Sequence, residues 1–97
     1  MKVVWSPLAI EKLETIAKFI ALDKPTAAEK WVNDIFDRAD LLGSQPESGR
    51  QVPELLGKSY REVIFGNYRI IYKVGNEIKI LTLRNCRQLL SMDDLEL

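Results

Sequence analysis

The residues that could take part in chemistry are concentrated between positions 58 and 87. This segment has seven basic and two acidic side chains, a net charge of +5, whereas the whole chain is neutral at pH 7. The basic residues are Lys58, Arg61, Arg69, Lys73, Lys79, Arg84 and Arg87, and the acidic ones are Glu62 and Glu77. A local basic cluster in a neutral protein predicts contact with an anionic partner. General coating of nucleic acid needs a larger positive excess and is not expected.

Several classes of chemistry are disfavoured by composition. The chain has no histidine and one cysteine, Cys86, so we expect no zinc site, no histidine-based triad and no cofactor. A single cysteine cannot form an internal disulfide, which favours a cytoplasmic protein. The N-terminus lacks a signal-peptide pattern and the apolar runs are too short to span a bilayer, so no membrane contact is expected.

Two Gly-Asn pairs divide the C-terminal half of the chain into three runs rich in β-branched and aromatic residues. They are Gly66-Asn67 and Gly75-Asn76, nine residues apart. Two-residue loops of this composition form tight hairpins, because both residue types tolerate a positive φ. The pattern therefore predicts three antiparallel strands between residues 60 and 84. With two residues in each loop, Ile70 is expected opposite Leu81.

This register assigns each side chain to one face of the sheet, because side chains alternate along a strand. One face is almost wholly apolar and must be covered by the rest of the chain; it carries Val63, Phe65, Tyr68, Ile70, Tyr72, Leu81 and Leu83. The opposite face mixes cations with four isoleucines, Ile64, Ile71, Ile78 and Ile80. A contiguous apolar patch usually marks a contact site, so we expect a partner there. Partial coverage by the C-terminal tail is the alternative.

The N-terminal half predicts a short strand followed by two helices. Lys2–Trp5 reads as the strand, and Ser6-Pro7 is a helix start with a hydroxyl N-cap and proline at the first position. Apolar residues at helical spacing continue to about Leu22, and a second apolar stripe follows Pro25 as far as Gly43. A short connection implies an antiparallel helical hairpin. Packing this hairpin on the apolar sheet face gives one α+β domain over residues 1–97.

Two segments have no regular pattern. The linker from Ser44 to Ser59 is long for a compact domain; such loops are often functional, although wrapping around a sheet edge is the ordinary explanation. The tail after Asn85 contains several leucines, and its periodicity leaves a short helix and an extended arm equally open.

The motifs in their order and spacing resemble the RelE/ParE superfamily, the toxic halves of bacterial and archaeal type II toxin–antitoxin pairs. The resemblance covers most of the chain. Its motifs are Trp5-Ser-Pro7, Asp23-Lys-Pro-Thr-Ala-Ala28, Pro46-Glu-Ser-Gly-Arg50, Val52-Pro-Glu54, Arg61-Glu62, Phe65-Gly-Asn-Tyr-Arg-Ile-Ile-Tyr72 and Leu83-Arg-Asn-Cys-Arg87. It implies the same helical hairpin on an antiparallel sheet that the residue patterns predict.

One branch of this superfamily cleaves mRNA at the ribosome. Such cleavage needs a proton acceptor, a proton donor and cations on the phosphate. The resemblance places Arg69 as the sheet arginine and Arg87 or Arg84 as the late arginine. However, no tyrosine follows Tyr72 and no histidine is present. Glu62 is better interpreted as a salt-bridged sheet residue than as a lone base, so an enzyme is not expected.

The linker motif and the short C-terminus resemble the ParE branch, which inhibits DNA gyrase and is neutralised by an antitoxin within a hetero-oligomer. On this interpretation Arg61, Arg69, Arg84 and Arg87 contact the target, and Ile64, Ile71, Ile78 and Ile80 bind the antitoxin. The alternatives are a RelE-like, ribosome-dependent mRNA interferase and a member that only binds its antitoxin.

Overall fold

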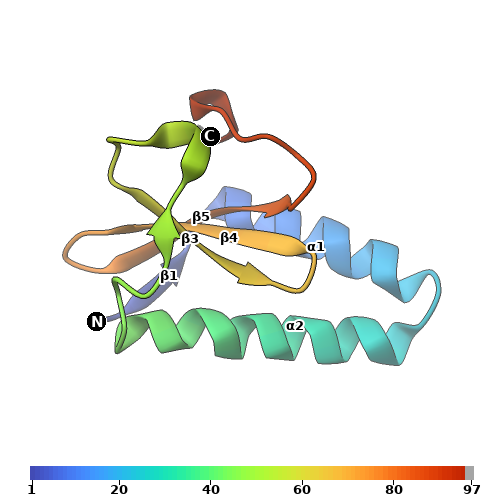
Figure 1. Cartoon of the computed structure of the whole chain (residues 1–97). Coiled ribbons are helices and arrows are strands. Elements are labelled where there is room, and N and C mark those ends of the chain that lie inside the picture. The colour runs from blue at the N-terminus through green and yellow to red at the C-terminus, as the bar shows by residue number, and fades with distance from the viewer. Residues whose placement is uncertain (96–97) are drawn as a thin grey trace.

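The computed structural model describes residues 1–95 as two helices on one side of a five-stranded sheet (Figure 1). The strand order is β1-β5-β4-β3-β2, with β1 parallel to β5 and the other neighbours antiparallel. The elements are β1 (Val3–Trp5), α1 (Pro7–Ala21), α2 (Pro25–Asp40), β2 (Arg50–Gln51), β3 (Tyr60–Phe65), β4 (Tyr68–Val74) and β5 (Ile78–Asn85), with 3-10 turns at Leu41–Gly43, Pro53–Leu55 and Met92–Leu95.

The N-terminal predictions are confirmed. The Ala9 amide donates a 3.0 Å hydrogen bond to the Ser6 side chain, and proline occupies the first turn of both helices. The sequence did not indicate where the short N-terminal strand would pair. The Ser6 amide donates to the Ile80 carbonyl and the Ile78 amide donates to the Lys2 carbonyl, which fixes β1 beside β5.

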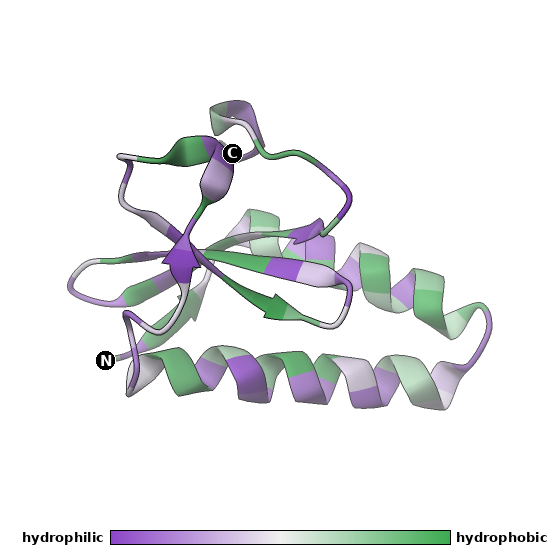
Figure 2. Cartoon of the chain, in the orientation of Figure 1, coloured by the Kyte–Doolittle hydropathy of each residue, from purple (hydrophilic) through white to green (hydrophobic). Residues whose placement is uncertain are grey.

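The main core lies between the helices and one face of the sheet. Its buried members from the helical half are Ala9, Leu13, Ile35, Ala39 and Leu42, and those from the sheet are Val63, Ile70, Tyr72, Ile78, Ile80 and Leu83. Figure 2 shows hydrophobic stretches in both helices and in the strands that they cover. This burial is the main favourable contribution to folding, and it matches the predicted two-layer α+β arrangement.

The first hairpin has the predicted register and the second does not. Phe65 lies opposite Tyr68, and Gly66 takes a φ of +58° in the turn. In the second hairpin Val74 pairs with Ile78, so the connection is three residues long. An irregularity between Ile71 and Tyr72 then adds one more residue on β5.

The longer loop moves Ile78 and Ile80 to the helix-side face, and the irregularity then returns Thr82, Leu83 and Arg84 to the faces predicted for them. Ile78 and Ile80 are fully buried in the helix-side core, and Ile71 is fully buried on the other face. Ile64 is 48% exposed, the only one of the four with a substantial exposed surface. The predicted exposed face of four isoleucines is therefore wrong, because a one-residue shift exchanges the faces of a strand.

A second, smaller core covers the sheet face that the helices leave free. Val52 and Leu55 from the linker and Leu90 from the tail pack with Ile71. Figure 1 shows the linker and the C-terminal segment lying together on this side of the sheet. The tail therefore covers the middle of this sheet face, as the alternative to a partner surface predicted. The linker covers it as well.

The linker is also tied to the helix-side core through Tyr72. The tyrosine hydroxyl donates a 2.8 Å hydrogen bond to the Pro46 carbonyl and accepts a 2.9 Å bond from the Gly49 amide. A Cβ atom at Gly49 would lie 2.6 Å from both the Glu62 carbonyl and that hydroxyl, so only glycine fits. The linker is therefore an ordered part of the fold, and it contains the edge strand β2.

The two registers predict different effects of shortening isoleucines. Ile80→Ala should lower the free energy of unfolding by about 2–5 kcal/mol, because it leaves a cavity under the helices. Ile64→Ala should change it by no more than about 1 kcal/mol, because that side chain is half exposed. Urea denaturation of both variants measures the difference. Similar small losses for both would instead support the two-residue second loop.

Candidate functional site

The centre of the free sheet face is occupied by a buried ion-pair network around Arg69 on β4. Its Nε donates to Glu62 Oε1 at 2.8 Å, and its two terminal nitrogens donate to the two Glu54 oxygens at 2.7 Å each. The same guanidinium donates to the Gln88 carbonyl at 3.1 Å. Arg69 is 5% exposed, so the network lies beneath the linker and the tail.

The strands place these charges within reach of one another. Glu62 on β3 lies opposite Ile71 on β4. Glu62 is therefore the diagonal neighbour of Arg69 on the same face of the sheet. Glu54 comes from the short turn after Pro53, where the linker crosses the sheet. Arg50 completes the network from β2, with Nη2 2.6 Å from Glu62 Oε2. The interpretation of Glu62 as a salt-bridged sheet residue is confirmed.

The contacts between Glu54 and Arg69 favour the charged forms of both side chains. Hydrogen bonds from Arg69 lower the pKa of Glu54 to about 2, assisted by the Leu90 amide. The bonds to Glu54, and then those to Glu62, raise the pKa of Arg69. A carboxylate with a depressed pKa and saturated partners is a poor proton acceptor, so Glu54 is suited to holding the linker on the sheet.

Arg69 was predicted to contact the target, and the structure does not present it to a target. A phosphate or carboxylate approaching from solvent would have to displace Glu54, Glu62 and the Gln88 carbonyl. Burial of a saturated arginine makes that exchange costly. The cation nearest the centre of the sheet therefore belongs to the internal architecture.

Two of the other predicted cations are also committed to the chain itself. Arg84 Nε donates to the Leu89 carbonyl, and its Nη1 lies 3.2 Å from Asp94 Oδ1. This ion pair joins β5 to the acidic tail. Arg61 donates to the Gly49 carbonyl at 2.7 Å and so fixes the linker. Both are partly exposed; Arg84 holds the tail, whereas Arg61 lies opposite Tyr72 of the helix-side core and holds the linker before β2.

Arg87 differs from the other three arginines. It is exposed and makes no ion pair among residues 1–95, and its amide donates to the Asn85 side chain at 2.9 Å. The Cys86 amide donates to the Asn67 carbonyl at 2.8 Å, which brings the turn after β5 beside the β3–β4 turn. A hollow of about 280 Å³ between them is lined by Asn67, Asn85, Cys86 and Arg87. The four predicted arginines thus do not form one surface.

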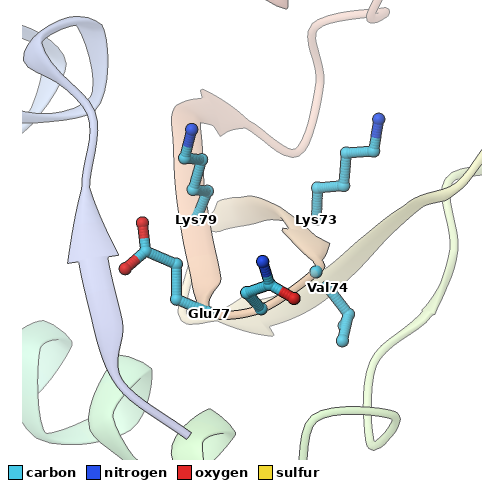
Figure 3. Close-up of a pocket in the computed structure, with 6 residues that line it drawn as sticks. Lys73, Val74, Glu77 and Lys79 are labelled. Atoms are coloured by element: carbon cyan, nitrogen blue, oxygen red, sulfur yellow. The ribbon is translucent and has the colours of Figure 1, made fainter.

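The opposite end of the sheet carries two exposed lysines that the sequence prediction did not select. Lys73 on β4 lies directly opposite Lys79 on β5, beside a hollow of about 550 Å³ at the β4–β5 turn. Figure 3 shows both side chains extending on the same side of the hairpin, with the Glu77 carboxylate directed toward β1. The Lys73 amino group lies 5.5 Å from the centre of the Tyr60 ring.

The described residues provide no constellation for metal or proton-transfer chemistry. Residues 1–95 hold no group of three or more histidine, cysteine, aspartate or glutamate side chains that would bind a metal ion. Neither helix in this range combines the length and the apolar content needed to cross a membrane.

Known proteins share both the sequence pattern and the fold. The profile of the ParE toxin of the type II toxin–antitoxin system parDE matches residues 3–90. The protein named "Putative toxin Y4kP" from Sinorhizobium fredii (strain NBRC 101917 / NGR234) is 33% identical over 89 residues, 90% of each chain. A chain of the structure described as the chromosomal ParDE TA system from P. aeruginosa has a TM-score of 0.74 at 23% identity, covering 88% of this chain and 95% of that chain.

The chain belongs to the ParE toxin family of type II toxin–antitoxin systems. The solved ParDE structure supports the fold independently, because it covers nearly all of both chains. The sequence-based assignment to this branch is confirmed.

The buried network predicts an asymmetric response to removing its two arginines. Arg69→Met should lower the free energy of unfolding by about 3–5 kcal/mol, because it leaves Glu62 and Glu54 without their shared cation. Arg50→Ala should cost no more than about 1 kcal/mol, because the Arg50 side chain is 63% exposed. Guanidinium denaturation at pH 7 measures both. Equal losses would contradict a network centred on Arg69.

Acid should weaken the fold through Glu54. Its pKa is depressed in the folded state, so its contribution is complete above the unfolded pKa near 4.5 and is lost as pH falls toward 2. We expect the free energy of unfolding to fall across this window by up to about 2 kcal/mol from this group. Glu54→Gln should flatten that part of the pH profile, whereas Glu11→Gln on α1 should not. An unchanged acid slope in Glu54→Gln would contradict the assignment.

Proposed function

We propose that the protein is a toxin that arrests growth by poisoning DNA gyrase in the cytoplasm and is neutralised by a cognate antitoxin in a hetero-oligomer. The observation that carries the choice of target is the burial of Arg69 between Glu54 and Glu62. Membership of the ParE family supports the same target, because the resemblance to this branch implies gyrase rather than the ribosome.

The alternative, cleavage of mRNA at the ribosome, places heavier demands on the site. Attack by a 2′-hydroxyl requires a base near that hydroxyl, an acid near the leaving oxygen and cations that face the phosphate. Arg69, the arginine that the resemblance assigns to the sheet, is saturated and 5% exposed. Glu62 is 1% exposed and holds two arginines. Inhibition by surface contact needs neither a proton acceptor nor an open central cation.

Arg87 is the arginine best placed for the target. It is exposed beside the β3–β4 turn and, among the described residues, forms no ion pair that a target carboxylate or phosphate would have to break. Arg84 and Arg61 hold the tail and the linker on either side of the network, so they position the surrounding surface. We infer that Arg87 carries the contact and that Arg84 and Arg61 support it indirectly.

Expression of the chain without antitoxin tests the target. We expect growth arrest with induction of the DNA-damage response, and inhibition of supercoiling by purified gyrase. Arg87→Ala should reduce the inhibition at least about tenfold, the scale for losing one well-placed charged contact. It should leave the melting temperature within about 1 °C of wild type, because the side chain is exposed and forms no ion pair within residues 1–95.

The control is Lys24→Ala, which removes an exposed cation in the connection between the helices and should leave inhibition unchanged. Arg84→Ala should lower toxicity and thermal stability together, because it releases the Leu89 carbonyl and Asp94. Translation arrest with codon-positioned mRNA cuts, and no effect on gyrase, would replace this proposal with the ribosome-dependent alternative. Full activity of a folded Arg87→Ala would exclude Arg87.

A further inference from the structure

Strands β4 and β5 place two pairs of like charges directly opposite each other on the free sheet face. Arg69 lies opposite Arg84, and Lys73 lies opposite Lys79. Like charges in directly opposed positions destabilise a sheet unless something neutralises them. For the arginine pair the chain supplies Glu62, Glu54 and Asp94 as neutralising groups.

For the lysine pair the described chain supplies none. Neither Lys73 nor Lys79 forms an ion pair within residues 1–95, and both are exposed. Glu77, the acid nearest in sequence, is directed toward β1 in Figure 3. Within the described residues, the pair of positive charges at one end of the sheet is thus neutralised, and the pair at the other end is not.

Within residues 1–95, the part of the free face around Lys79 also lacks the cover that protects the middle of the sheet. The linker and the tail pack with Ile71 on β4, and the second core does not extend to β1. Val4 on β1 lies directly beside Lys79, and both line a hollow of about 260 Å³ with Pro7 and Leu81. Leu81 is half-buried, next to the irregularity in β5. An apolar hollow therefore adjoins the lysine pair, with Lys79 shared between them.

We propose that this strip, formed by Lys73, Lys79, Val4 and Leu81, is the docking surface for a segment of the antitoxin that carries both carboxylate and apolar side chains. The inference rests on the proposed function, since it names the surface used by that partner. It places the contact away from Ile71, Ile78 and Ile80, which the fold itself buries.

The neighbouring groups favour an acidic peptide over the phosphate backbone of nucleic acid. Nucleic-acid binding draws on several cations along a path, whereas this strip has two lysines, the turn acid Glu77 and an apolar hollow. Carboxylates would neutralise the lysines, and apolar side chains would fill the hollow beside Val4 and Leu81. Electrostatic complementarity of this kind directs association and selects the partner.

The test uses Lys79→Glu, because the proposal predicts opposite changes in stability and binding. A glutamate opposite Lys73 turns a repulsive pair into an attractive one, so the melting temperature of the free toxin should rise by about 1–5 °C. Affinity for the antitoxin encoded beside the toxin gene should fall at least about tenfold, because the new charge repels the partner's carboxylates. Calorimetry of binding and thermal unfolding measure the two quantities.

Matched variants separate the outcomes. Lys24→Glu makes the same charge change in the connection between the helices and should leave the affinity for the antitoxin unchanged. Leu81→Gln should weaken that affinity about threefold or more, because it changes only the apolar hollow and no charge. In cells, Lys79→Glu should remain toxic and become harder to neutralise. Unchanged affinity of a folded Lys79→Glu would overturn this inference and leave the proposed function standing.

Two further results would count against it. Lysine-dependent binding to duplex DNA, with antitoxin affinity unaffected, would assign the strip to phosphate groups instead. A wild-type chain that neither binds the antitoxin nor arrests growth would contradict the proposed function itself. Measurements on the wild-type chain test that function separately from measurements on the variants.

Discussion

The arrangement of the free sheet face depends on one buried cation. Arg69 connects the sheet to the linker through Glu54 and to the tail through the Gln88 carbonyl. A buried arginine is tolerated only when its donors are satisfied, so these two segments are required where they lie. The small apolar cluster around Ile71 then packs between them. Removing the cation would take away the common partner of three parts of the chain.

This constraint also determines which charges remain for function. The sequence has a net charge of +5 between residues 58 and 87, yet much of that charge is used internally. Arg69 is buried, while Arg84 and Arg61 hold the flanking segments. Within residues 1–95, the cations of this segment whose side chains form neither an ion pair nor a hydrogen bond are Arg87 at one end of the sheet, Lys73 and Lys79 at the other, and Lys58 in the linker. A count of basic residues therefore overstates the basic surface of this protein.

Much of the fold could be predicted because its signals are local. The Ser6 cap, the proline starts of both helices and the Gly66 turn each depend on a few neighbouring residues, and each is observed. The second hairpin could not be predicted in the same way. Residues 78–83 contain apolar side chains at both alternating sets of positions, so the hydrophobic pattern is satisfied by either register. The extra loop residue brings Ile78 and Ile80 into the core and the bulge returns Leu83 to it, and neither leaves a signature in the composition of β5.

In the candidate site, too, some contacts could be predicted from local sequence and others could not. The pairing of Glu62 with a nearby cation was predictable, because the diagonal position follows from the first hairpin. The contribution of Glu54 was not, because it depends on how the linker crosses the sheet after Pro53. Lys73 was placed on the correct face, but its pairing with Lys79 depends on the shifted register of the second hairpin. Errors in register thus become errors in assigning which charges are neutralised.

The separation of the open cations bears on how an antitoxin would neutralise the toxin. Arg87 lies near the β3–β4 turn, whereas the lysine pair lies near the β4–β5 turn, at opposite ends of β4. Strand β4 has seven residues, and a strand rises about 3.3 Å per residue, so the two ends are roughly 20 Å apart. A segment confined to the lysine strip would leave Arg87 uncovered. Neutralisation from that strip then requires that the rest of the antitoxin either extends along the sheet or occupies the space that the proposed target, gyrase, would need.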